Sequence, residues 1–157
     1  MKKAKRIRVL ELRKITLAKV EYQGSFQGIG AAYGKLMQWA RSNGFSNPKT
    51  NKTLTIYHDD PNVVGMYNVR QSACIIANKP FEPTNEIKKT ELNAGKCVVG
   101  RYEISFFEFK EAWLEMFDWI HKNNLKVSKK DAFEVYQNNS NTHPLKKTII
   151  DICIPIE

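Results

Sequence analysis

Apolar residues recur along this chain in two kinds of spacing, and each kind occurs in both halves. Helical spacing runs from Ile29 to Ala40 and again from Phe109 to Ile120, which predicts two amphipathic helices. Runs rich in β-branched and aromatic residues predict strands at 7–22, 54–57, 72–77, 97–104, 133–136 and 148–154. Polar segments with Asn and Pro separate these elements. The pattern therefore predicts an α+β fold with antiparallel sheets.

The two halves match each other at a nearly constant separation in sequence. A separation of 80 residues aligns Tyr33 with Trp113, and a separation of 79 aligns Tyr57 with Tyr136. Further aligned pairs are Tyr22 with Tyr102, Phe26 with Phe106, Leu36 with Met116, Trp39 with Trp119 and Cys74 with Cys153. A constant offset across helix, turn and strands indicates an internal duplication of a strand-helix-strand-strand unit.

The duplication predicts how the chain is organised. The repeats are expected over residues 7–77 and 96–156, with a linker over 78–95. Together they would form one domain, residues 7–157, preceded by a basic tail over residues 1–6. Two such units are expected to place two main helices beside their sheets, with a cleft between the halves. Clefts of this kind are common ligand sites.

A strand near the C-terminal end carries the leading candidate for ligand chemistry. Because strand side chains alternate, Glu134 and Tyr136 share one face while Phe133 and Val135 share the other. A carboxylate amid apolar sequence is either at the surface or costly to bury and functional. The aligned position of the first repeat is Thr55, so the sheet itself does not require an acid there. We interpret Glu134 as the charged group of a ligand cavity.

Four aromatic residues are candidate walls of that cavity, namely Tyr33, Tyr57, Trp113 and Tyr136. Core packing is the alternative role for each of them. An organic cation would supply a counter-charge to Glu134 at less desolvation cost than a small ammonium. Aromatic faces would add cation–π attraction of roughly 0.5–2 kcal/mol each. The residues thus favour hydrophobic, cationic ligands bound with broad specificity.

A second acid, Asp151, stands where the first repeat has Ser72. We expect it to cap a turn or to pair with a lysine such as Lys146 or Lys147. The glycines around Gly28 do not fit the dinucleotide fingerprint. The three cysteines and three histidines are widely spaced, so no metal, disulfide framework or cofactor is indicated. No serine or cysteine lies in a nucleophile motif with a paired histidine.

The net charge of +9 is concentrated near the N-terminus. Residues 1–19 hold eight basic residues and one acid, so residues 20–157 carry a net charge of only +2. Sequence-specific DNA binding is therefore not expected, although a basic segment can contact phosphates weakly. No apolar run approaches the length of a membrane span, and no signal peptide is indicated. A cytoplasmic location is expected.

An ordered set of motifs resembles a known family. They are YQGSF (22–26), IYHDDP (56–61), SACI (72–75), FEVY (133–136) and DICIPI (151–156). The set resembles the GyrI-like small-molecule-binding domain, also found as the effector-binding domain of AraC-type regulators and in relatives of the DNA gyrase inhibitor. The resemblance implies a glutamate in the pocket, here matched by Glu134, that faces aromatic walls. It also implies that the ligands are hydrophobic, often cationic, compounds.

The sequence departs from the family pattern at two places. The family usually has an acid where Ser72 stands, and residues 63–68 (VVGMYN) replace a more polar stretch. No helix-turn-helix precedes residue 7, so a free-standing binding domain is expected rather than a whole regulator. Such a domain would act as a multidrug sensor or sequestering protein, with a DNA-binding regulator as a candidate partner.

Two alternative functions stay open. One is a gyrase-binding inhibitor or protector protein. The other is a hydrolase of cyclopropane-bearing toxins, in which Glu134 would be the general base and the catalytic residue. Binding without turnover is favoured over catalysis.

Overall fold

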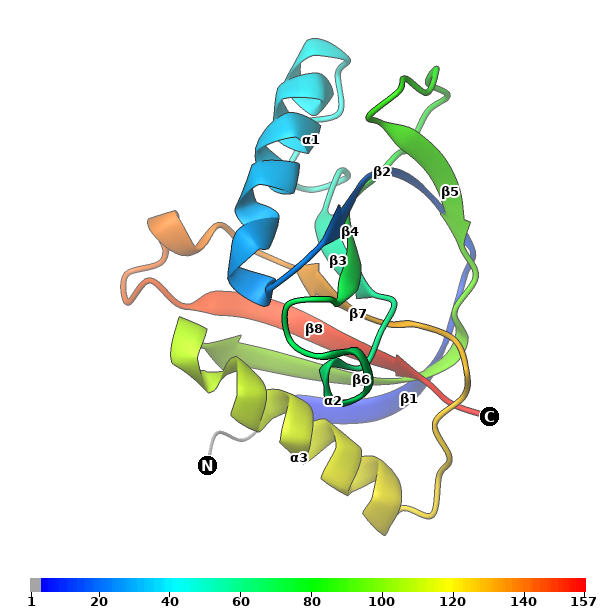
Figure 1. Cartoon of the computed structure of the whole chain (residues 1–157). Helices are drawn as coiled ribbons and strands as arrows, with labels where there is room; N and C mark the ends of the chain where they lie inside the picture. Colours follow the sequence, from blue (N-terminus) through cyan, green and yellow to red (C-terminus); the bar gives the residue numbers. More distant parts are fainter. Residues whose placement is uncertain (1–3) are drawn as a thin grey trace. The chain divides into compact units, whose positions relative to one another are not determined.

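The computed structural model describes residues 4–157, which divide into two units (Figure 1). The N-terminal unit comprises residues 14–93, and the C-terminal unit comprises residues 4–13 and 94–157. Each unit contains four antiparallel strands and one long helix, which confirms the α+β prediction. Within residues 4–157, no helix combines the length and apolar character that crossing a membrane requires.

The four strands of the N-terminal unit follow the order β3-β4-β2-β5. Its elements are β2 (Ile15–Gln23), the 3-10 helix η1 (Phe26–Ile29), α1 (Gly30–Ser42), β3 (Thr53–Tyr57), α2 (Pro61–Val64), β4 (Arg70–Ile76) and β5 (Lys88–Leu92). Helix α1 buries Ala32, Leu36 and Ala40 against the sheet. Gly44, with a φ of 79°, follows the helix in the left-handed conformation that favours glycine.

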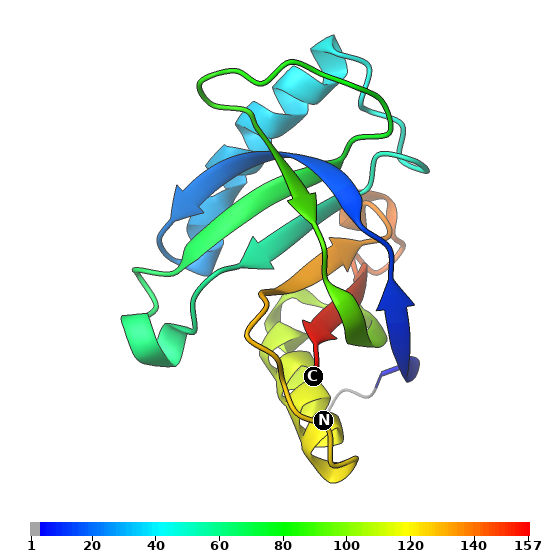
Figure 2. The ribbon, with the colours of Figure 1, turned by 90° about the vertical axis from the view of Figure 1, so that its right-hand side faces the viewer.

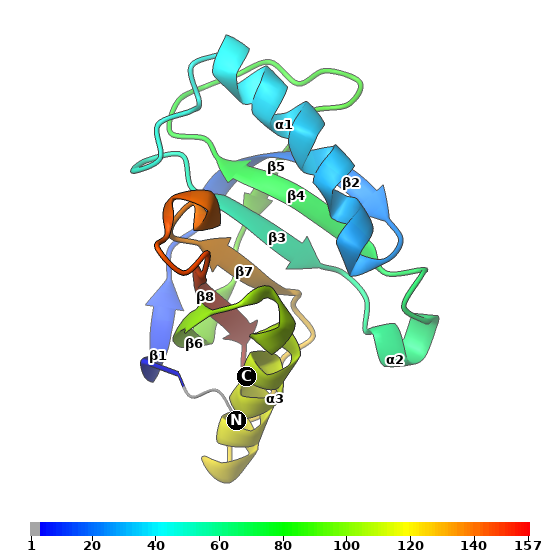
Figure 3. The ribbon, with the colours of Figure 1, turned by 90° about the vertical axis from the view of Figure 1, so that its left-hand side faces the viewer.

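The C-terminal unit has the strand order β1-β6-β8-β7. Its elements are β1 (Arg6–Leu12), β6 (Gly95–Ile104), the 3-10 helix η2 (Phe106–Glu108), α3 (Phe109–Lys122), β7 (Ala132–Tyr136), the 3-10 helix η3 (Ser140–Thr142) and β8 (Thr148–Pro155). Figures 2 and 3, taken from opposite sides, show that the long helix of each unit covers one face of its own sheet.

The start of α3 and its packing both follow from particular residues. Ser105 and Glu108 form the predicted capping box ahead of the helix. Met116 then packs so closely over Gly100 of β6 that a Cβ atom at that glycine would collide with its sulfur. The missing side chain at Gly100 therefore sets how near the helix lies to the sheet.

The two units share one architecture, which confirms the predicted duplication. The order β5-β2-β4-β3 in one unit corresponds to β1-β6-β8-β7 in the other. Even a helix-end hydrogen bond recurs at the aligned positions. The side-chain amide of Asn43 donates to the Trp39 carbonyl oxygen, and that of Asn123 donates to the Trp119 carbonyl oxygen, both at 2.8 Å.

One predicted strand is wrong, and the expected linker contains a strand. The long strand expected over residues 7–22 is broken after Leu12, because the consecutive charged residues Arg13 and Lys14 interrupt its alternation. Its first part, β1, pairs with β6 of the second repeat instead of continuing into the first. The linker expected over residues 78–95 contains β5, which pairs with β2 at the edge of the sheet.

The predicted basic tail lies partly outside the described residues, since residues 1–3 are not described. The remaining part of the tail is ordered against the sheet. Strand β1 already begins at Arg6, and the Lys5 backbone N–H donates to the Arg101 carbonyl oxygen at 2.8 Å.

Candidate ligand-binding site

The carboxylate of Glu134 lies in the middle of β7 and is almost completely buried, with 2% of the residue exposed. The indole Nε1–H of Trp113 donates to its Oε1 at 2.5 Å. The hydroxyl of Tyr136 donates to its Oε2 at 2.9 Å. Three of the five predicted site residues therefore meet in the C-terminal unit, with each carboxylate oxygen accepting a hydrogen bond from an aromatic side chain.

Local structure explains why these three residues meet. Tyr136 lies two residues beyond Glu134 in the same strand, so their side chains share a face. In the register of β7 and β8, Glu134 lies opposite Ile152, which belongs to the core beneath α3. Trp113 follows the buried Ala112 on that helix and reaches the same face of the sheet. The acid thus sits on the helix-covered face, where apolar residues would ordinarily pack.

The electrostatics of this arrangement are unusual for a sheet interior. Hydrogen bonds from neutral donors stabilise a carboxylate in its charged form, but they do not cancel its charge. Trp113 also packs against the Phe117 ring, with centroids 6.2 Å apart, and Phe117 is 43% exposed. An aromatic path therefore extends from the buried acid to the surface of α3. Phe117 was absent from the predicted site, although its position four residues after Trp113 was a usable signal.

The other two predicted site residues lie in the N-terminal unit. The hydroxyl of Tyr33 on α1 is hydrogen-bonded to the Thr55 Oγ1 on β3 at 2.7 Å. Tyr33 aligns with Trp113 and Thr55 with Glu134, so the same helix-to-strand hydrogen bond occurs once in each repeat. Within this aligned pair of contacts, the C-terminal one involves an acidic side chain and the N-terminal one a hydroxyl.

The ring of Tyr57 meets the edge of Phe26, with centroids 5.6 Å apart and planes at 86°. Tyr33 and Tyr57 are thus described in one unit, and Trp113, Glu134 and Tyr136 in the other. That all five line a single cavity stays a prediction.

The second acid has a different partner from the one expected. Asp151 forms a two-pronged ion pair with Arg101, and it accepts a hydrogen bond from Gln137 Nε2 at 3.0 Å. The prediction of a lysine partner is wrong because Arg101 lies directly opposite Asp151 in the register of β6 and β8. The hydrogen bond to Asp151 raises the pKa of Arg101, so the two side chains form a compensated ion pair.

A serine–histidine contact was also missed. The Nε2 of His58 lies 2.7 Å from the Oγ of Ser72, at the positions that align with Gln137 and Asp151. Ser72 is completely buried on β4, so this contact ties the residue that follows β3 to β4.

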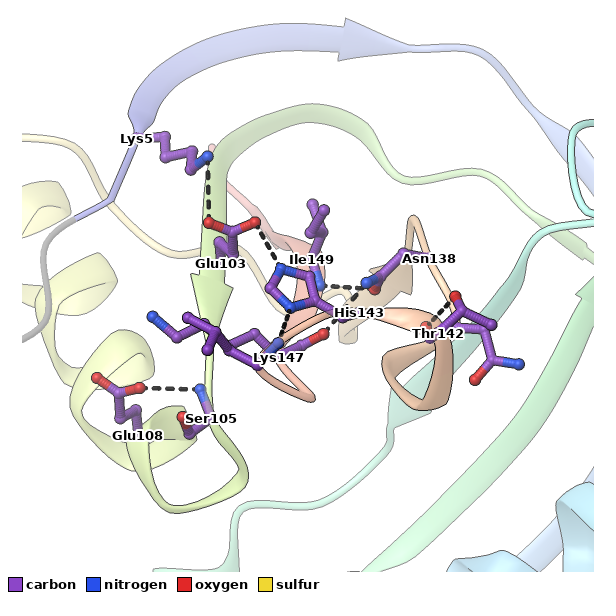
Figure 4. A network of polar contacts seen from close by, with 11 residues as sticks. Lys5, Glu103, Ser105, Glu108, Asn138, Thr142, His143, Lys147 and Ile149 are labelled. Carbon is purple, nitrogen blue, oxygen red and sulfur yellow. Dashed lines mark hydrogen bonds and ion pairs between the residues drawn. The ribbon is translucent and has the colours of Figure 1, made fainter.

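A polar network fixes the segment that follows β7 (Figure 4). Glu103 accepts a hydrogen bond from His143 Nε2 at 3.0 Å, and Lys5 Nζ lies 3.5 Å from the same carboxylate. These two partners, His143 first, lower the pKa of Glu103. The Leu145 backbone N–H donates to the other histidine nitrogen, Nδ1, at 3.0 Å. The network anchors the loop around η3 to β6 and so supports the end of β7.

The fold and the buried acid together define a class of protein. Each unit repeats one arrangement of strands and a helix, with an acid at a strand position of the second repeat where the first repeat has Thr55. The chain belongs to the family described as the GyrI-like small molecule binding domain, which it matches over residues 5–157.

One curated protein and two solved structures are similar to this chain. It is 27% identical over 114 residues to DNA gyrase inhibitor 2 of Dickeya dadantii (strain 3937), covering 71% of each chain. Its fold is similar to that of EcmrR in a complex with DNA, with a TM-score of 0.80 and 14% identity over 97% of this chain. The chain spans 57% of the EcmrR chain. It is also similar to SAV2435 bound to tetraphenylphosphonium, with a TM-score of 0.62, 15% identity, and coverage of 97% and 94%.

Proposed function

We propose that this protein binds hydrophobic organic cations and that Glu134 is the charged group that selects them. One observation carries the proposal, namely a carboxylate that is 2% exposed and hydrogen-bonded to the aromatic side chains of Trp113 and Tyr136. The relative SAV2435, whose structure contains tetraphenylphosphonium, supports the same ligand class.

The physical basis is the match between a buried charge and a large, weakly hydrated cation. A charged carboxylate loses hydration when it is buried, so a cation close to it is favoured. At about 6 Å and an effective dielectric constant of about 20, two opposite unit charges attract by about 3 kcal/mol. The rings of Trp113, Phe117 and Tyr136 add cation–π attraction and apolar contact. Such a site selects ligands by their positive charge and aromatic bulk. A protein with this site would act as a sensor of broad specificity or as a sequestering protein.

The experiment compares two ions of one shape and opposite charge, tetraphenylphosphonium and tetraphenylborate, by isothermal titration calorimetry. Wild type should prefer the cation. Glu134→Gln should weaken cation binding about 10- to 100-fold and should not weaken anion binding.

The matched control is Glu115→Gln. Glu115 is another carboxylate on the same unit, and it accepts a hydrogen bond from the Tyr102 hydroxyl at 2.7 Å. This control should leave both affinities unchanged. Equal losses for cation and anion in Glu134→Gln, or a similar loss in Glu115→Gln, would remove Glu134 as the selecting charge.

A second candidate function is inhibition or protection of DNA gyrase, which the relative named DNA gyrase inhibitor 2 favours. This role needs a protein partner and a cytoplasmic location. A gyrase supercoiling assay with added protein tests it, in the presence and absence of tetraphenylphosphonium. An unchanged supercoiling rate at excess protein argues against this function.

The hydrolase alternative has a stricter chemical requirement. Trp113 and Tyr136 donate to the two oxygens of Glu134, so a general base at this position would have to hold a water on a remaining lone pair of an almost completely buried carboxylate. Binding without turnover is therefore the simpler function. Mass spectrometry of cyclopropane-bearing electrophiles after incubation decides between them, because a pure binding protein returns them unchanged.

A further inference from the structure

One buried polar atom in the N-terminal unit, the Oε1 of Gln71, has no hydrogen-bond partner among residues 4–157. The residue is 1% exposed, and its Nε2 donates to the Gly24 carbonyl oxygen at 3.1 Å. This bond fixes the amide, because a flipped side chain would set Oε1 against the carbonyl oxygen. Oε1 is therefore held in place as an unused acceptor. Buried acceptors of this kind cost free energy and are rare in native proteins.

The neighbours of Gln71 are aromatic. In the antiparallel register it lies opposite Tyr22 of β2 on one side and Tyr57 of β3 on the other. Ala73, two residues further along β4, belongs to the core beneath α1, so the amide lies on the helix-covered face. The Tyr22 hydroxyl already donates to the Ser25 carbonyl oxygen at 2.8 Å. The hydroxyl proton of Tyr22 is therefore used in the turn and is not donated to the Gln71 Oε1.

The aromatic surroundings of Gln71 extend toward solvent. Tyr57 packs edge-to-face on Phe26, and Phe26 is 41% exposed at the start of η1. Tyr57 thus connects Gln71, which lies opposite it in the register of β3 and β4, with the exposed ring of Phe26. The aligned residue in the second repeat is Ile150, which is completely buried and apolar. The acceptor is therefore a property of the N-terminal unit alone and is not a consequence of the duplicated fold.

We propose that the N-terminal unit contains a second, uncharged ligand subsite, in which the Gln71 Oε1 accepts a hydrogen bond from an N–H donor on a planar aromatic ring. An indole-like group fits this chemistry because it offers one in-plane donor and two apolar faces. This subsite differs from the one proposed at Glu134, since it selects ligands by a hydrogen-bond donor and not by charge. The two proposals can fail independently of each other.

The test uses indole and 1-methylindole, which differ at the donor. Binding is followed by protein NMR, with each compound titrated into the wild-type chain and into Gln71→Met. Wild type should bind indole about tenfold more tightly than 1-methylindole, because the methylated ring leaves the acceptor unpaired. Gln71→Met, which fills similar volume without an acceptor, should bind the two compounds equally. Glu115→Gln, whose carboxylate accepts from the Tyr102 hydroxyl in the other unit, should keep the tenfold preference of the wild type.

A second measurement covers the case in which Gln71→Met does not fold. In the wild type, indole should shift the side-chain amide resonances of Gln71, and 1-methylindole should shift them much less. The proposal is overturned if wild type binds both compounds equally or binds neither at millimolar concentration. It is also overturned if the preference survives in Gln71→Met, or if the Gln71 resonances respond alike to both compounds. Equal affinities would be expected if an internal water served the acceptor.

Discussion

The hydrogen bond from Tyr136 to Glu134 offers a quantitative test of whether the buried acid is charged. Tyr136→Phe removes the hydroxyl that lies 2.9 Å from Oε2 and leaves the ring in place. Hydrogen bonds to charged groups contribute about 1.5–3 kcal/mol, and water cannot easily replace the donor at a residue that is 2% exposed. The free energy of unfolding at pH 7 should therefore fall by about 1.5–3 kcal/mol, or roughly 10- to 150-fold in the folding equilibrium constant.

A double-mutant cycle with Glu134→Gln separates the charge from the rest of the contact. Against a neutral amide the same hydroxyl should contribute only about 0.5–1.5 kcal/mol, so the coupling should be about 1 kcal/mol or more. Urea unfolding followed by circular dichroism gives all four values. Tyr102→Phe is the control, since the Tyr102 hydroxyl donates to a different carboxylate, Glu115, at 2.7 Å. A coupling for Tyr136 no larger than that for Tyr102 would refute a charged Glu134.

Three further predictions concern stability and reactivity away from the site. Burial raises the pKa of Cys74 to about 12 and all three cysteines are buried, so DTNB at pH 8 should label them only after unfolding; rapid native labelling would contradict the described packing. Ser105→Ala should lower the free energy of unfolding by about 1 kcal/mol in urea titrations, because it removes one half of the capping box with Glu108, and an unchanged midpoint would deny the cap any role. The Arg70 guanidinium lowers the pKa of Asp59 from 3.8 to about 2, so its stabilising contribution is present above pH 3.8 and is lost as the pH falls toward 2. Asp59→Asn should flatten the acid side of the stability curve in that window, and an unchanged acid limb would contradict the pairing.

The elements that sequence could predict are those with strong periodicity or a repeat to compare. Helices α1 and α3 and the strands that follow them were predicted because their apolar spacing is regular in both halves. Strand β5 was missed because its sequence, Lys88–Leu92, has little apolar character, as an edge strand with exposed side chains allows. The pairing of β1 with β6 leaves no local signal, since strand pairing depends on residues distant in sequence.

The candidate site was predictable only in part. Strand alternation placed Glu134 and Tyr136 on one face, and the offset between repeats singled out the acid. The contact with Trp113 requires the helix position over the sheet, which sequence spacing does not give. The partner of Asp151 was predicted wrongly for a similar reason, because cross-strand register places Arg101 opposite it.

The most direct test of the central claim follows the hydrogen bond between Trp113 and Glu134 by NMR while a cation binds. The chain has three tryptophans, Trp39, Trp113 and Trp119, so their indole N–H resonances can be assigned by single substitution. Titration with tetraphenylphosphonium should shift the Trp113 indole N–H resonance until it saturates, and the resulting affinity should equal the one measured by calorimetry. The Trp39 indole N–H resonance should not shift. Saturable binding of the cation without any change at the Trp113 resonance would contradict a ligand site at Glu134.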